Sequence, residues 1–252
     1  MRGTSTATRS DGPPAMVVVA HGSRDPRALR TVRALLDRVR ELRPALPVHL
    51  GHIELNEPLL PDTLAALGGT RAVLVPLLLS RGHHVKRDIP EMAAAAPART
   101  RVAAPLGPHP LLVDALHDRL VEAARPAHGP RPGAVVLAAA GSRDPESRAD
   151  TGRTARLLAE RLGVPVVPAY ASAAAPTVPE AVRSLAARGH RRIAVASCFT
   201  APGRFAAECA AAAPWIASAP LGTHPAMARL LLHRYDEALG ATVTTAPVLA
   251  TA

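Results

Sequence analysis

Short apolar segments alternate along the chain with longer segments whose apolar residues recur every three or four positions. In the first half the apolar segments are residues 16–20, 48–55, 72–78 and 101–104. The segment after the first of them places one set of apolar residues on a single helical face: Leu29, Val32, Leu35, Leu36, Val39 and Leu42. Strands that are apolar on both faces and separated by helices predict a parallel sheet with helices on both sides. Ligands of such sheets bind beyond the carboxyl ends of the strands, so we expect the chemistry in the loops there.

The second half of the chain repeats the first. The string AMVVVAHGSRDP from Ala15 returns as AVVLAAAGSRDP from Ala134, and APLGPHP from Ala104 returns as APLGTHP from Ala219. We therefore predict an α/β fold of two tandem doubly wound parallel-sheet domains related by internal duplication. The predicted divisions are a disordered N-terminal tail 1–14, a first domain 15–124 carrying the site, a linker 125–133, a degenerate second domain 134–239 and a flexible tail 240–252.

Composition excludes several classes of protein. With 48% hydrophobic residues the chain can form a core, so disorder throughout is excluded. The longest apolar run, residues 72–79, is too short to cross a bilayer, and residues 1–15 contain no apolar signal core. We expect a soluble cytoplasmic protein with no membrane partner. Cys198 and Cys209 do not have the spacing of a zinc ribbon or a disulfide framework.

The net charge of +10 is compatible with nucleic acid, an anionic membrane or a polyanionic small molecule. Proteins that bind nucleic acids often interleave basic and aromatic residues, but the first aromatic residue here is Tyr170. A nucleic-acid partner is therefore not expected. All aromatic residues (two Phe, two Tyr and one Trp) lie in the second half, so any ring stacking on a ligand has to come from there.

Comparison of the two repeats separates structural residues from candidate functional ones. The string GSRDP is present in both halves, and its residues suit a turn at Gly22, a helix cap at Ser23 or Asp25, and a first helical residue at Pro26. The histidine before it, His21, is present in the first half only.

Three residues with metal-ligating side chains follow three successive strands of the first half and are lost from the second. His21 becomes Ala140, Glu54 becomes Ser172 and His84 becomes Phe205, with Pro58, expected to open the next helix, aligned on Pro176. A carboxylate such as Glu54 is costly at the end of an apolar strand unless it is paired, ligated or solvated. The first half is therefore predicted to be active and the second degenerate.

Two imidazoles and one carboxylate form an open site for a divalent metal such as iron, cobalt, nickel or zinc. General acid–base catalysis without a metal uses the same residues and is the alternative. His109 and His224 are present in both halves, which favours a helix-cap or packing role. A metallohydrolase would need a second cluster of carboxylates or histidines, and the sequence offers none.

The strings AHGSRDP, IELNEP and PLLLSRGHHVKRDIP, in this order and spacing, resemble the sirohydrochlorin chelatases, the class II tetrapyrrole chelatases. The resemblance covers residues 15–239 and includes the duplicated two-domain bacterial form. It implies insertion of Co²⁺ or Fe²⁺ into sirohydrochlorin with release of two protons, in cobalamin or sirohaem biosynthesis. It also implies that no organic cofactor is needed and that the metal ion is a substrate, with Ni²⁺ compatible with the same ligands.

Carried over by position, the resemblance makes His21 and His84 the active-site histidines and Glu54 their acidic partner, as a metal ligand or as a base. His83 is the alternative to His84. The substrate is rich in carboxylates, so Ser23, Arg24, Arg81, Lys86 and Arg87 are expected to bind it, the alternative being a solvated basic loop. Among the aromatic residues of the second half, Phe205, which replaces the second histidine, is the main candidate for contact with the macrocycle. A non-catalytic metal or tetrapyrrole carrier is the alternative function, and the duplication predicts a monomer, since one chain supplies both halves of the cleft.

Overall fold

The computed structural model describes residues 12–124 and 131–240 of the chain. Residues 1–11, 125–130 and 241–252, and with them most of the two predicted tails and of the predicted linker, lie outside the described residues. The first half contains β1 (Ala15–Ala20), α1 (Pro26–Leu42), β2 (Val48–His52), α2 (Leu60–Leu67), β3 (Ala72–Pro76), the π-helical turn η1 (His84–Asp88), α3 (Ile89–Ala95), β4 (Thr100–Val102) and α4 (Pro110–Ala124). The second half contains β5 (Ala134–Ala139), α5 (Pro145–Leu162), β6 (Val166–Tyr170), α6 (Val178–Ala187), β7 (Ile193–Ser197), α7 (Arg204–Ala211), β8 (Ile216–Ala217) and α8 (Pro225–Gly240).

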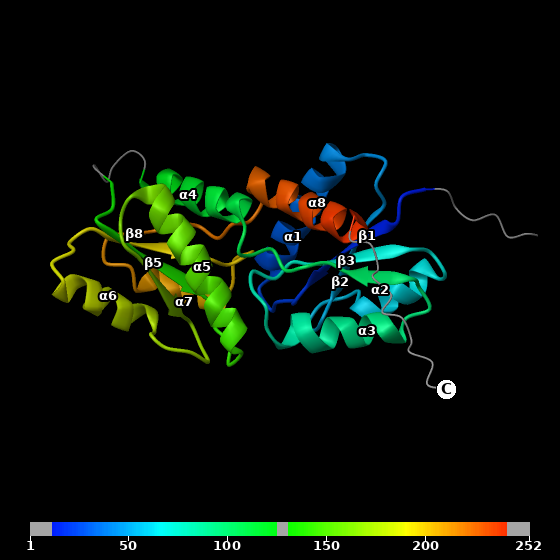
Figure 1. The fold of residues 1–252 in the computed structure, drawn as a ribbon, viewed down its shortest axis with the longest axis horizontal. Coiled ribbons are helices and arrows are strands. Elements are labelled where there is room, and N and C mark those ends of the chain that lie inside the picture. The colour runs from blue at the N-terminus through cyan, green and yellow to red at the C-terminus, as the bar shows by residue number, and fades with distance from the viewer. Residues whose placement is uncertain (1–11, 125–130, 241–252) are drawn as a thin grey trace, which may run out of the picture.

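Each half forms a four-stranded parallel sheet, and the two sheets have the same order, β2-β1-β3-β4 and β6-β5-β7-β8. Every residue of β1 and of β5 is buried, as expected for central strands covered on both faces. Met16 and Val18 of β1 face the core that contains α1, whereas Val17 and Val19 face the core that contains α2 and α3. This alternation confirms the prediction of two doubly wound α/β sheets (Figure 1).

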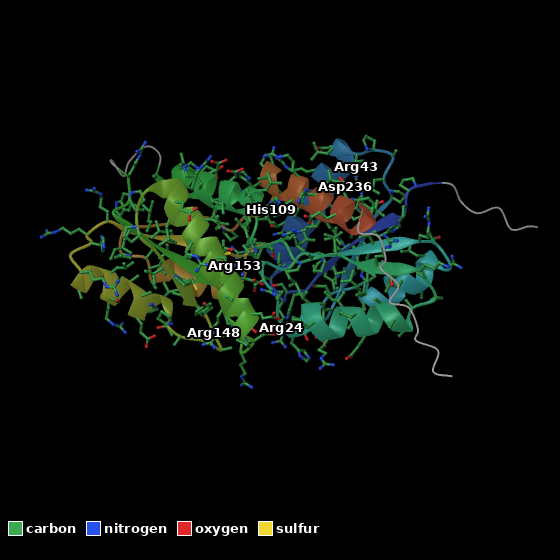
Figure 2. All side chains as sticks on the ribbon, viewed as in Figure 1. Arg24, Arg43, His109, Arg148, Arg153 and Asp236 are labelled. Atoms are coloured by element: carbon green, nitrogen blue, oxygen red, sulfur yellow. The ribbon has the colours of Figure 1, made fainter. Side chains whose placement is uncertain are left out.

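The last helix of each half packs against the other half. Helix α4 contacts α5 and the strands β7 and β8 of the second sheet, whereas α8 contacts α1 and β3 of the first sheet (Figure 1). One continuous hydrophobic core consequently includes apolar residues from both sheets and from both exchanged helices. Arg43, after α1, reinforces the exchange through a double ion pair of 2.6 and 2.8 Å with Asp236 of α8 (Figure 2). The predicted domain boundaries follow the repeat along the chain, so they assign α4 to the first domain and α8 to the second, although each helix packs against the other half.

The second strand is shorter than predicted, and Pro58 does not open the following helix. The strand ends at His52, where the backbone N–H of His52 donates to the Pro58 carbonyl oxygen at 3.0 Å. The Pro58 segment is thus held against the end of the strand, and α2 begins at Leu60, with Pro61 in its first turn. The residues between, including Glu54, form a loop in which Leu55 has a positive φ of 66°.

The described residues contain no helix that is long and apolar enough to cross a membrane.

Candidate active site

A cavity of about 380 Å³ lies between the two halves at the carboxyl ends of their strands. The first half contributes His21 and the segment from Leu77 to Val85, which includes His83 and His84. The second half contributes loop residues, one face of α5, and two phenylalanines: Ala139, Ala140, Gly141, Ser142, Ser147, Thr151, Thr154, Ser172, Cys198, Phe199, Thr200 and Phe205. The cavity therefore lies where ligands of doubly wound sheets bind.

His21 and Glu54 leave neighbouring strands and meet at this edge of the sheet. The backbone N–H of Glu54 donates to the His21 carbonyl oxygen at 3.0 Å, so the two loops continue the pairing of β1 with β2. His21 Nε2 lies 3.5 Å from Glu54 Oε1, with side chains that are 42% and 54% exposed. His21 lines the cavity, and both side chains are within reach of water.

Gly22 makes the close approach of these two loops possible. It has a φ of 103°, and a Cβ at this position would lie 1.9 Å from the Glu54 carbonyl oxygen. Gly141 occupies the same place in the second half, with a φ of 93° and a Cβ position 1.9 Å from the Ser172 carbonyl oxygen. The helix-cap role predicted for the repeated string is also confirmed, because Asp25 and Asp144 each accept the backbone N–H two residues ahead at 2.9 Å.

His84 lies next to His21. The ring centroids are 4.8 Å apart, in an edge-to-face arrangement. His84 Nδ1–H donates to Asp88 Oδ2 at 2.5 Å, one turn further along η1. This hydrogen bond holds the proton on Nδ1 and leaves the Nε2 lone pair of His84 free for a metal ion.

His83 is oriented differently. Its side chain is 75% exposed, and its Nε2 lies 3.3 Å from Asp88 Oδ1. Its ring centroid is 6.3 Å from that of His84. Of the two neighbouring histidines, His84 is therefore the one that the structure places beside His21.

The three predicted ligands form an open row and not a closed metal cage. Within residues 12–124 and 131–240, no three His, Cys, Asp or Glu side chains are grouped closely enough to hold a metal ion. Glu54 contacts His21, and His21 contacts the exposed edge of His84, which is 36% exposed. An ion bound here would need small rotations of these partly exposed side chains and would keep coordination positions open.

The predicted substrate-binding residues fall into two groups. Ser23, Arg24 and Arg87 are not among the residues that line the cavity: the backbone N–H of Ser23 donates to Asn56 Oδ1 at 2.7 Å, and Arg24 and Arg87 are exposed. Among the described residues neither arginine forms an ion pair, and Arg24 lies at the junction of the two halves (Figure 2).

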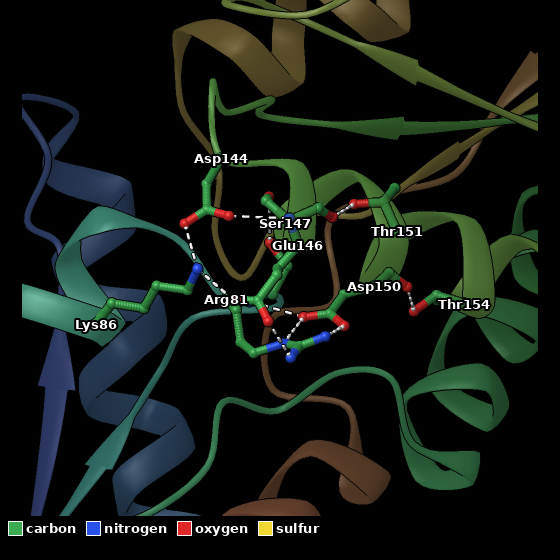
Figure 3. A network of polar contacts seen from close by, with 9 residues as sticks. Arg81, Lys86, Asp144, Glu146, Ser147, Asp150, Thr151 and Thr154 are labelled. Atoms are coloured by element: carbon green, nitrogen blue, oxygen red, sulfur yellow. Dashed lines mark hydrogen bonds and ion pairs between the residues drawn. The ribbon is translucent and has the colours of Figure 1, made fainter.

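Arg81 and Lys86 form the second group, because carboxylates of α5 and of its cap already bind them (Figure 3). Asp150 receives hydrogen bonds from the backbone N–H of Arg81 at 3.0 Å and from its guanidinium at 2.7 and 2.9 Å. Burial opposes ionisation of Asp150, but these bonds outweigh it and hold its pKa below the usual value. Lys86 pairs with Asp144 at 2.8 Å and with Glu146, which raises the pKa of the Lys86 ammonium. A substrate-binding role for these two cations stays a prediction.

His52 has structural contacts, and so do the two histidines that the sequence assigns to a cap or packing role, His109 and His224. His109 Nδ1 accepts the backbone N–H of Leu111 at 3.1 Å, and His224 Nδ1 accepts that of Ala226 at 3.2 Å, each in the first turn of an exchanged helix. This confirms the predicted cap role. His52 is 1% exposed and its Nδ1–H donates to the Pro58 carbonyl oxygen, and burial lowers its pKa.

Two residues of the site were not found by the sequence reasoning. The signal for Asp88 is its spacing of four residues from His84, which places the two side chains together on a helical turn. Asp150 is remote in sequence from the histidines and lies in the half predicted to be degenerate. Comparison of the repeats contained its signal, since the position aligned with Asp150 is Thr31.

Comparisons with known proteins identify the family of the chain. The CbiX family model matches residues 15–123 and 134–238. The sirohydrochlorin ferrochelatase of Bacillus subtilis (strain 168) is 32% identical over 181 residues, which covers 68% of this chain and 68% of the relative. The sirohydrochlorin cobaltochelatase of Methanopyrus kandleri is 31% identical over 137 residues, 43% of this chain and 96% of the relative. The structure of SirB from Bacillus subtilis with Fe³⁺ has a TM-score of 0.71 at 26% identity and covers 90% of this chain and 95% of its own. With both halves matched by the same family model, the chain belongs to the CbiX family.

Proposed function

We propose that this protein is a sirohydrochlorin chelatase, which inserts a divalent metal ion into the tetrapyrrole and releases two protons. One observation carries the proposal: His21 and His84, from two different strand ends, lie 4.8 Å apart in a cavity between the halves, with Glu54 beside His21. The named relatives are sirohydrochlorin ferrochelatases and cobaltochelatases, and the family match extends over both halves.

The residues suit the chemistry of insertion. Pyrrole nitrogens bind a metal ion well only after they lose their protons, so each ion inserted must be exchanged for two protons. Glu54 lies 3.5 Å from His21 Nε2 and is half exposed, so it can accept a proton and return it to water. His84 presents Nε2 to the ion because Asp88 binds its other nitrogen. An open set of ligands also lets the ion leave the protein for the macrocycle.

The proposal extends to the identity of the metal ion that is inserted. Imidazole and carboxylate ligands accept iron, cobalt and nickel alike, and the relatives include enzymes for iron and for cobalt. We propose Co²⁺ or Fe²⁺ as the substrate, with no organic cofactor. The test follows sirohydrochlorin absorbance with each metal in parallel at a catalytic concentration of enzyme. Turnover with one metal supports the proposal, whereas a single stoichiometric burst indicates a carrier.

The partners follow from the same site. We propose a monomer, because both halves of one chain line the cavity. We further propose that the protein works in the cytoplasm without a nucleic-acid or membrane partner, and the free, buried thiols of Cys198 and Cys209 suit a reducing compartment. Sedimentation of the purified protein tests the monomer, and cell fractionation tests the compartment.

Asp88→Asn should weaken metal binding. The amide removes the negative charge that holds the proton on His84 Nδ1, and such changes to the partner of a ligating histidine typically cost about 10–100-fold in affinity or activity. Titration with Co²⁺, followed by absorbance, should show a loss of about tenfold or more. Glu91→Gln, an exposed residue in the first turn of α3, is the matched control and should leave the affinity unchanged. Equal affinities for both variants would contradict the role of Asp88.

Phe205→Ala should weaken binding of the macrocycle. Phe205 and His84 both line the cavity, and the Arg204 guanidinium lies over the Phe205 ring at 4.6 Å from its centroid, so the aromatic ring offers a flat surface for a ring ligand. Loss of one stacking contact of about 1 kcal/mol predicts a KM for sirohydrochlorin that is raised about fivefold, with kcat nearly unchanged. Phe205→Tyr, which keeps the aromatic ring, should retain the original KM. A KM unaffected by the alanine variant would exclude this contact.

A further inference from the structure

The two halves meet through two equivalent loop contacts. A Cβ at Gly82 would lie 3.6 Å from the Ser142 hydroxyl oxygen, and a Cβ at Gly203 would lie 3.9 Å from that of Ser23. Gly82 and Gly203 are equivalent in the repeat, as are Ser23 and Ser142. In each contact, the loop after the third strand of one half therefore touches the loop after the first strand of the other.

In the part of the chain that the structure describes, ion pairs between the halves are found at one of these two contacts and not at the other. At the Gly82 contact, Arg81 binds Asp150 and Glu146, and Lys86 binds Asp144 and Glu146 (Figure 3). The hydroxyls of Ser80 and Ser147 add a hydrogen bond of 2.9 Å between the halves.

The equivalent side chains at the Gly203 contact cannot form this network. Arg81 and Lys86 align with Pro202 and Ala207, whereas Glu146 and Asp150 align with Arg27 and Thr31. The guanidinium of Arg27 instead pairs with Asp25 of its own half at 2.7 Å. Among the described residues, ion pairs between the halves are thus present at the loop that carries His84, whereas Arg204, next to Phe205 in the equivalent loop, pairs with Glu208 of its own helix.

The network fixes the backbone of the His84 loop and not only its side chains. Asp150 is 1% exposed, and it accepts the backbone N–H of Arg81 as well as two hydrogen bonds from the Arg81 guanidinium. Lys86 follows His84 by two residues and is held by the cap and first turn of the same helix, α5. The turn that contains His84 is therefore tied to the second half on both sides of the histidine.

We propose that Asp150 is a positioning residue: through Arg81 it holds His84 against His21, so the second half, which has lost the ligands, sets the geometry of the metal site. The inference rests on the proposed function, and it assigns Arg81 and Lys86 to the loop's anchorage and not to binding of substrate carboxylates.

The test compares Asp150→Asn with Asp236→Asn. Each substitution removes the carboxylate from a double ion pair between the halves. The pair of Asp236 with Arg43, however, joins α8 to the end of α1, and neither Asp236 nor Arg43 lines the cavity. Co²⁺ affinity, kcat, KM for sirohydrochlorin and thermal stability are measured for both variants. Asp150→Asn should lower Co²⁺ affinity and kcat about tenfold with KM within about twofold, whereas Asp236→Asn should lower only thermal stability.

Other outcomes separate the alternatives. Unchanged Co²⁺ affinity and kcat in Asp150→Asn would overturn the inference, and so would a change confined to KM, which is the result expected if Arg81 binds the substrate. If Asp150→Asn fails to fold, Glu146→Gln at the half-exposed end of the same network takes its place, with an expected loss of about threefold in Co²⁺ affinity. If the unsubstituted protein binds Co²⁺ but inserts no metal, the proposed function fails, and the Co²⁺ titrations still decide the role of Asp150.

Discussion

Replacing His21 or His84 by alanine should reduce metal insertion by at least about a hundredfold, because each variant removes one of the two adjacent imidazoles. Neither change should unfold the protein. The side chains are 42% and 36% exposed, and substitutions at such positions usually alter the free energy of unfolding by less than about 1 kcal/mol. The measurements are the initial rate of sirohydrochlorin consumption with Co²⁺ or Fe²⁺ and the midpoint of thermal unfolding.

The neighbouring histidine provides the control for this experiment. His83 is 75% exposed and lies further from the other imidazoles, so His83→Ala should keep a rate within a few-fold of the unsubstituted protein. A large loss in His83→Ala together with a normal rate in His84→Ala would exchange the roles of the two residues. Normal rates in both His21→Ala and His84→Ala would reject the site.

Much of the fold could be predicted because its signals are local. The apolar strands, the amphipathic helices and the repeated GSRDP string specify two parallel sheets, and the structure has both sheets in the same order. The resemblance to the chelatases is confirmed by the family match over both halves. The exchange of α4 and α8 could not be predicted, because the apolar face of a helix does not reveal which of two equivalent sheets it covers.

The sequence predicts those site residues that differ between the two repeats. His21, Glu54 and His84 differ from their counterparts in the second half, and the structure brings His21 next to both of the others. Asp150 differs from its counterpart Thr31 as well, but its role could not be predicted, because its partner Arg81 is 69 residues away and the sequence does not show that α5 packs against the His84 loop. The predicted end of the second strand was wrong. Strand β2 ends at His52 because the following loop turns back and the Pro58 carbonyl oxygen accepts the backbone N–H of His52.

Gly22→Ala should both destabilise the protein and damage the site. A Cβ at Gly22 would lie 1.9 Å from the Glu54 carbonyl oxygen, and the φ of 103° is unfavourable for any side chain. To relieve this clash, the loops that carry His21 and Glu54 would have to move apart, which would break the backbone hydrogen bond between those two residues. We expect the free energy of unfolding to fall by about 3 kcal/mol or more, and kcat of the folded fraction to fall at least about tenfold.

Two alanine variants separate the effects on stability and on the site. Gly141→Ala places a Cβ 1.9 Å from the Ser172 carbonyl oxygen in the equivalent loop of the second half, so it should cost a similar free energy of unfolding with a much smaller loss of kcat. Gly163→Ala, at the end of α5, has a φ of 68° and open space around its Cβ, so it should cost only about 1 kcal/mol and leave kcat unchanged. Denaturant unfolding and the insertion rate, measured on all three variants, decide between a local and a general effect. If Gly22→Ala and Gly141→Ala lower kcat equally, the separation of the His21 and Glu54 loops is not the cause, and the loss reflects general destabilisation of the cleft between the halves.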